Sequence, residues 1–246
     1  MLSLKEIFEN FKIDEQKSLN RITDKNIKLV QHISDIRFLW GYNQIFGLYH
    51  LFIGNNLQLA KQDFYTCGRI DEYLIKKYDS RLLDAGMANV CYALLSDDSG
   101  LIKRYTELGH SKYRWMVEHG HSTIVYAFQQ AIKGDWEQVK WSLEIMNTKN
   151  QKLNKGLLPD RMFLEGLCAK NQKKMEEALL LLLKDHKKRN KHMGIAQDYI
   201  SIPTLGYAKL AWLKGIEVEV DHPLIPKESL PYRPLPKYED KYDFLK

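Results

Sequence analysis

The sequence predicts an all-α protein of stacked helical hairpins, similar to a tetratricopeptide-like α-solenoid, followed by an extended, proline-rich C-terminal tail. Apolar residues recur at helical spacing along the 246 residues, and no stretch before the tail alternates with a period of two. Turns separate the helical segments at spacings of roughly 36 to 43 residues, as in α-solenoid repeats. The full tetratricopeptide consensus is absent, so we predict repeat-like hairpins and not a named repeat.

The N-terminal part of the chain carries the first predicted hairpin. Residues 1–30 contain no continuous apolar segment, so we expect neither a secretory signal nor a membrane span. We therefore expect the protein to be cytoplasmic. Residues 42–64 then form two helical segments around a turn at residues 54–56.

The second predicted hairpin, at residues 82–108, turns at Asp97, Asp98 and Gly100. Two adjacent carboxylates could take part in acid–base chemistry or bind a cation. Asp followed by Ser is also an ordinary start of a helix, so we favour helix capping here.

The third and fourth hairpins lie at residues 122–146 and 160–183. In the third, Gly134 ends the first helix, and Asp135 with Gln138 resembles a capping box for the second. The fourth turns at Asn171 and Gln172. Residues 178–183 are apolar on all sides, which predicts that this helix lies in the middle of the stack.

The last predicted helix begins near Pro203 and ends at Gly215, and it is followed by the tail. Five of the seven prolines follow Gly215, and proline excludes helix and central strand. Large apolar residues between these prolines make a free linker improbable, so we expect the tail to pack along the helices. We therefore predict a helical body at residues 1–221 and a packed tail at residues 222–246.

The chain is modestly basic, which raises the question of nucleic-acid binding, but the distribution of its charges argues against it. The formal net charge is +6, but 37 basic residues are interspersed with 31 acidic ones. The dense basic cluster at residues 184–192 ends an apolar helix, where cations are favourable. Residues 103–115 add a basic and aromatic stretch that includes Arg104, Arg114 and Trp115, which could stack bases but is more typical of a core.

No catalytic or metal-binding motif is found. There is no GxSxG, no glycine-rich phosphate loop and no HExxH; His119 and His121 are spaced poorly for a metal site. Cys67, Cys91 and Cys168 lie far apart in apolar contexts, which predicts free, buried thiols. We therefore expect a protein that is not an enzyme and has no cofactor or metal.

The C-terminal region also carries a family resemblance. The final helix, Gly215, a short β-branched run, and then Asp221, Pro223 and Pro226 resemble the carboxy-terminal signature of the Imm49 family of bacterial immunity proteins, mainly over residues 120–244. This resemblance implies a protein that binds a cognate toxin domain and neutralises it by stoichiometric occlusion. The alternatives are a tetratricopeptide-like protein-binding scaffold and a nucleic-acid-binding helical repeat.

Four carboxylates at predicted turns and helix starts are candidate partner-binding residues: Asp97, Asp98, Asp160 and Asp198. A helical stack exposes side chains at such positions, and basic toxin sites attract carboxylates. Their alternative role is helix capping.

Overall fold

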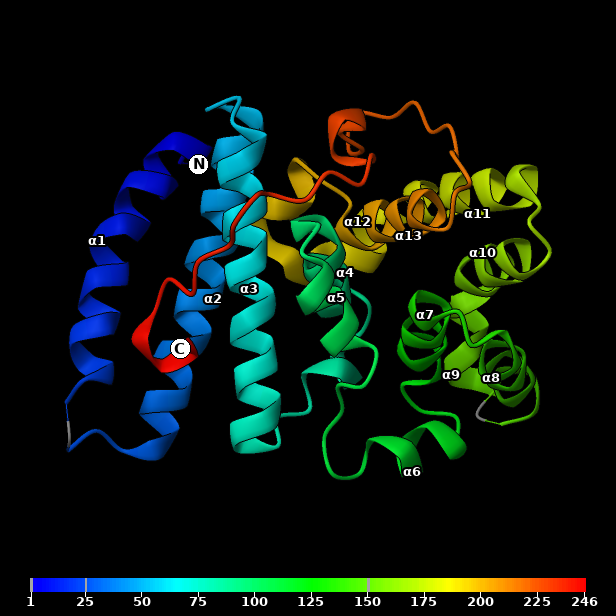
Figure 1. The fold of residues 1–246 in the computed structure, drawn as a ribbon, viewed down its shortest axis with the longest axis horizontal. Helices are drawn as coiled ribbons and strands as arrows, with labels where there is room; N and C mark the ends of the chain where they lie inside the picture. Colours follow the sequence, from blue (N-terminus) through cyan, green and yellow to red (C-terminus); the bar gives the residue numbers. More distant parts are fainter. Residues whose placement is uncertain (1, 25, 150) are drawn as a thin grey trace.

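The computed structural model describes residues 2–24, 26–149 and 151–246, and it is 73% helical (Figure 1). No strand occurs among the described residues. The predicted all-α class is therefore confirmed.

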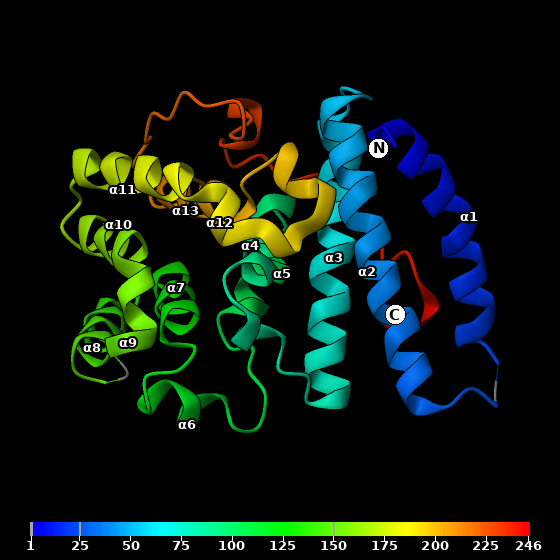
Figure 2. The same ribbon diagram turned by 180° about the vertical axis from the view of Figure 1, so that it is seen from behind.

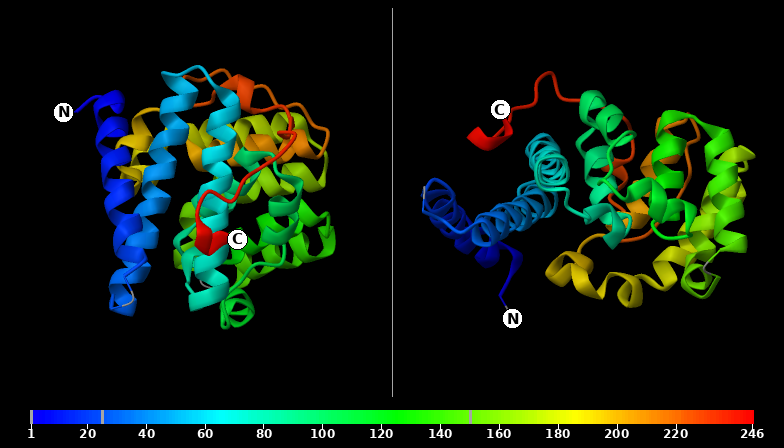
Figure 3. Two further views of the ribbon diagram at one scale, coloured as in Figure 1. Left: turned by 60° about the vertical axis from the view of Figure 1, so that its left-hand side comes forward. Right: turned by 90° about the horizontal axis from the view of Figure 1, so that it is seen from below.

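Three long helices lie side by side at the N-terminal end of the molecule: α1 (Leu4–Ile22), α2 (Leu29–Phe52) and α3 (Leu57–Tyr78) (Figures 1 and 3). A capping box starts α1, because Ser3 Oγ accepts from the backbone N–H of Glu6 and the Glu6 carboxylate accepts from that of Ser3. The predicted turn between α2 and α3 is confirmed, and Asn56 caps α3. Within the described ranges, no helix is long and apolar enough to cross a membrane.

The remaining helices form the other half of the body. In chain order they are η1 (Leu82–Ala85), α4 (Ala88–Ser96), α5 (Ser99–Tyr105), α6 (Tyr113–Glu118), α7 (Thr123–Lys133), α8 (Trp136–Thr148), α9 (Gln151–Asn154), η2 (Lys155–Leu157), α10 (Leu158–Cys168), α11 (Gln172–Lys184), α12 (His186–Asn190), η3 (Lys191–Asp198) and α13 (Ile202–Leu213).

The predicted α7–α8 and α10–α11 hairpins are confirmed. Gly134 ends α7 with φ of 88°, a left-handed conformation that favours glycine. Asp135 caps α8 by accepting from the backbone N–H of Gln138 at 3.1 Å, and Asn171 caps α11 in the same way. The Gln138 side chain accepts from Tyr126 Oη, so only the Asp135 half of a capping box is present.

The last helix, α13, packs against α4, which lies far away in sequence. Gly206 allows the two helices to approach closely, because a Cβ atom there would lie 2.1 Å from Cys91 Sγ. Pro203 stands in the first turn of α13, and Gly215 follows it with φ of 76°, as the sequence predicts. This contact joins the last helix of the body to a central one.

The prediction that α11 lies in the middle of the stack is wrong. Leu180 and Leu181 are 54% and 37% exposed, and α11 lies at the edge of the molecule (Figure 1). Its buried residues Met175, Ala178, Leu179, Leu182 and Leu183 form one stripe. The neighbouring helices α10 and α13 cover only that stripe of α11. The other apolar side chains of the run therefore remain exposed.

The tail crosses one face of the molecule, while α12 and η3 cross the opposite face (Figures 2 and 3). The tail is extended except for two short turns, η4 (Lys227–Ser229) and η5 (Asp243–Leu245). Four of its apolar side chains are buried: Ile225, Leu230, Tyr242 and Leu245. Tyr232, by contrast, is 39% exposed.

Candidate partner-binding surface

Asp97 is not exposed, contrary to the prediction for this turn. It follows α4 in a left-handed conformation with φ of 63°, and its carboxylate is 0% exposed. Lys61 of α3 and Lys209 of α13 form ion pairs with it at 2.7 and 2.6 Å. The turn is covered because α3 and α13 bring these two lysines over it, which the sequence around Asp97 does not indicate.

The same cluster of Asp97, Lys61 and Lys209 holds the tail. Lys61 Nζ donates to the carbonyl of Arg233, and Lys209 Nζ donates to that of Ser229, both at 2.6 Å. The backbone N–H of Arg233 donates to Asp97 Oδ2 at 3.2 Å. Burial lowers the pKa of Lys209, although Asp97 opposes this shift. These contacts give Asp97 a structural role.

Asp160 is also buried, so its predicted exposure is wrong too. Its carboxylate is 0% exposed, and it accepts hydrogen bonds from Arg189 Nη2 at 2.7 and 2.9 Å and from Tyr207 Oη at 3.0 Å. Burial raises the pKa of Asp160, and Arg189 opposes the rise. Since Arg189 belongs to the basic cluster at residues 184–192, part of that cluster is used inside the fold.

The other two candidate carboxylates are more accessible. Asp98 caps α5, because Oδ1 accepts from the backbone N–H of Leu101 at 2.6 Å, so the predicted capping is confirmed. Asp198, at the end of η3, is exposed. The structure therefore does not bring the four carboxylates together in one site, because Asp97 and Asp160 lie in separate buried ion pairs.

Two groups of side chains contain the residue types of a hydrolase without its geometry. Ser122 Oγ donates to Asp84 Oδ1 at 2.6 Å, and His110 Nε2 lies 3.1 Å from the same oxygen. A catalytic triad needs the histidine between the serine and the carboxylate, whereas Asp84 stands between the other two here. His186 and Ser201 lie 3.0 Å apart but are 3% and 0% exposed, so a substrate has no access to them.

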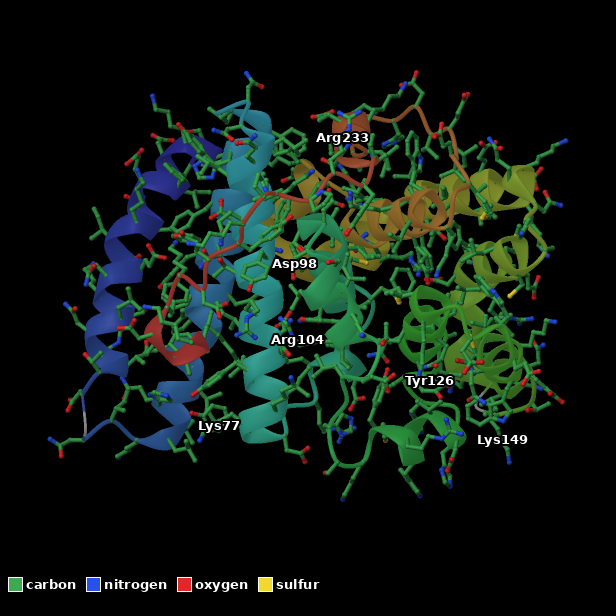
Figure 4. The ribbon with its side chains drawn as sticks, in the orientation of Figure 1. Lys77, Asp98, Arg104, Tyr126, Lys149 and Arg233 are labelled. Atoms are coloured by element: carbon green, nitrogen blue, oxygen red, sulfur yellow. The ribbon has the colours of Figure 1, made fainter. Side chains whose placement is uncertain are left out.

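A groove made of two adjoining pockets lies along α7. One pocket also contacts α5, the end of α13 and the tail, and the other also contacts α6 and α8. Its apolar half encloses about 480 Å³ and is lined by Ile102, Lys103, Ile132, Leu213, Lys214 and Tyr232. Its polar half encloses about 350 Å³ and is lined by Tyr113, Arg114, Tyr126, Gln130 and Gln138. Thr106, Glu107 and Lys133 line both halves, so we treat them as one feature, the α5–α7 groove. In Figure 4, Asp98 and Arg104 mark α5, and Tyr126 marks α7.

Arg114 makes several side-chain contacts at the polar end of the groove, while its side chain remains 52% exposed. Its guanidinium lies 4.5 Å from the ring centroid of Trp141 and 5.4 Å from that of Tyr126. It donates to Glu118 at 2.8 Å and to Tyr126 Oη at 2.7 Å. A guanidinium held by such contacts loses less conformational entropy than a free one when it binds a partner.

The rest of the basic and aromatic stretch at residues 103–115 has mixed roles. Tyr105 and Tyr113 are buried in the core, and Arg104 donates to the buried carboxylate of Glu72 at 2.8 Å. Trp115 is 55% exposed and stacks on His119, with ring centroids 4.2 Å apart. The core interpretation therefore holds for the two tyrosines, while Trp115 faces solvent.

The apolar half of the groove contains a cation that no described carboxylate neutralises. Lys214 is half-buried, and its Nζ donates to the backbone carbonyl of Ile132 at 2.7 Å. Burial lowers the pKa of Lys214. Lys133, by contrast, forms an exposed ion pair with Glu107 at 2.7 Å.

A second groove, of about 830 Å³, lies between α3 and the tail. Gln58, Leu59 and Gln62 form one wall, and residues 235–241 form the other. The side-chain amide of Gln62 bonds both the N–H and the C=O of Glu239, at 3.1 and 2.8 Å. The tail therefore already occupies the Gln62 side chain of this wall.

Comparison with known proteins gives one family. The model of the Imm49 family, described as Immunity protein 49, matches residues 50–229, which is more than half of the chain. No curated protein and no solved structure matches the chain.

Proposed function

The chain belongs to the Immunity protein 49 family, and on this basis we propose that it binds a cognate bacterial toxin domain and neutralises it by stoichiometric occlusion. The family match is the observation that carries the proposal.

The α5–α7 groove is the surface that we propose for the toxin. With the exception of Tyr232, its lining residues fall within the matched range of residues 50–229. The tail wall of the α3–tail groove lies after that range, so it is a poorer candidate for a surface that the family shares. An apolar patch bordered by polar and charged groups also matches the apolar core and polar rim of a protein interface.

The charge of the groove indicates what kind of toxin surface it fits. Arg114, Lys103, Lys133 and Lys214 outnumber the acidic residues Glu107 and Asp135. A toxin that docks here would present a neutral or acidic surface, because like charges in an interface cost several kcal/mol. This agrees with the basic net charge of the chain.

If the gene next to this one encodes a toxin, co-expression of the two proteins tests this proposal. We expect growth to be rescued only when this protein is at least equimolar with the toxin, and we expect an isolated complex with a Kd of about 1 nM or lower, since free toxin harms the producing cell. Rescue at far lower amounts, or loss of rescue on chelation of metals, would indicate an enzyme. A chain with no effect on a neighbouring toxin would favour a protein-binding scaffold.

A further inference from the structure

Three lysines border the apolar half of the α5–α7 groove, and they differ in whether a carboxylate neutralises them. Lys133 is neutralised by Glu107 at 2.7 Å. Lys103 is exposed and Lys214 is half-buried, and neither forms an ion pair with a residue that the structure describes. Two of the three cations are therefore available to a ligand.

Lys214 is held in place by groups that do not neutralise it. Its Nζ donates to the Ile132 carbonyl at 2.7 Å, in the last turn of α7, and lies 5.8 Å from the ring centroid of Trp136. An ammonium has three donors, so this carbonyl leaves further donors for a partner. A partly desolvated cation of this kind gains more from a carboxylate than a fully solvated lysine does.

The floor between the lysines is apolar. Ile102 and Ile132 are 6% and 8% exposed, Leu213 is partly buried, and Tyr232 of the tail is 39% exposed. The enclosed volume of about 480 Å³ is large enough for a leucine, methionine or aromatic side chain. An apolar floor offers nothing to a phosphate backbone, whereas it suits the anchor side chain of a protein interface.

We infer that the groove binds a toxin segment that places a large apolar side chain on Ile132 and Tyr232 and an adjacent carboxylate between Lys103 and Lys214. This inference rests on the proposed function and specifies the chemistry of the partner. Lysines that border an apolar floor would favour a segment that carries both an apolar side chain and a carboxylate, and they would disfavour a basic segment.

The test uses the full-length protein and the purified toxin domain that the co-expression experiment identifies, in calorimetric titrations. We expect Lys214→Met and Lys103→Met each to weaken binding about 10-fold, and Lys214→Arg, which keeps the charge, to bind more tightly than Lys214→Met. Lys173→Met on α11 is the matched control, because Lys173 is an exposed lysine outside the groove. Tyr232→Ser, which removes the aromatic wall, should also weaken binding about 10-fold.

The outcomes distinguish a failure of this inference alone from a failure of the proposed function. If the parent protein binds the toxin tightly and the groove variants bind it within about twofold, the function stands and the inference is overturned. If the parent protein does not bind the toxin, both are overturned. Thermal unfolding of each variant shows whether the fold is retained. The inference would also be overturned if a 20-nucleotide DNA bound the parent protein and bound the Lys214→Met variant more weakly.

Discussion

Asp97→Asn should destabilise the protein strongly, although the substitution changes one atom. Asparagine is also well suited to the left-handed conformation at φ of 63°, so the backbone is not perturbed. The change removes the negative charge between Lys61 and Lys209, and it also replaces one acceptor oxygen with an NH2 group that can only donate toward these donors. We expect the free energy of unfolding to fall by about 3 to 5 kcal/mol.

This magnitude follows from the burial of all three side chains. The Asp97 carboxylate is 0% exposed, and the side chains of Lys61 and Lys209 are 4% and 3% exposed. Without the negative charge, the ion-pair partner of both ammonium groups is lost, and the tail carbonyls of Arg233, Ser229 and Pro231 remain as uncharged acceptors. Breaking a buried ion pair costs about 3 to 5 kcal/mol, and here two cations are left without an anion. In a chain of this size that loss lowers Tm by roughly 6 to 20 °C.

Urea unfolding followed by circular dichroism measures the effect. Asp98→Asn is the matched control, because Asn caps a helix about as well as Asp does, and we expect it to change stability by less than about 0.5 kcal/mol. In the Asp97→Asn background, Lys209→Met should restore part of the lost stability by removing one of the two uncompensated cations. The reasoning is refuted if Asp97→Asn is as stable as Asp98→Asn.

Three further predictions concern the tail, a buried carboxyl group and a helix contact. Deleting residues 222–246 should lower the free energy of unfolding by several kcal/mol, because Ile225 is among four apolar tail side chains that are buried; an unchanged Tm would contradict this. Asp71 is 1% exposed, and burial raises its pKa from 3.8 to about 7. Between these two pH values the folded protein keeps a proton that the unfolded chain has released, so the free energy of unfolding should fall as the pH rises from about 4 to about 7. Asp71→Asn should therefore gain stability relative to the parent between pH 5 and pH 8, and parallel pH profiles in chemical unfolding would disprove it. Gly206→Ala should lower Tm markedly, because the added Cβ would lie 2.1 Å from Cys91 Sγ, and a melting curve like that of the parent would show that α4 and α13 can separate without loss.

The sequence predicted the local features of the fold well. The turns at residues 54–56, at Gly134 with Asp135, and at Asn171 were recognisable because each depends on a few neighbouring residues. A left-handed glycine or a capping side chain satisfies the backbone groups at a helix end, wherever that helix packs later. The all-α class and the family resemblance were likewise predicted from residues that lie close together in the sequence.

The candidate site was predicted only in part. Residues 103–115 were singled out for their basic and aromatic composition, and this stretch supplies Arg114 and Lys103 to the groove. Ile132, Lys214 and Tyr232 were missed, because they come from α7, the end of α13 and the tail. No signal in the sequence connects these three positions.

Burial was decided by the tertiary structure. Asp97 and Asp160 have the same local signals as an exposed helix cap, yet Lys61, Lys209 and Arg189 arrive from distant elements and cover them. Leu180 shows the converse, since it lies in an apolar run and remains 54% exposed at the edge of the body. Helix formation depends on contacts within a few residues, whereas burial depends on which distant surfaces meet. The sequence by itself therefore determined the helices and their ends. Only the packed structure determined which charges are enclosed and which groove stays open.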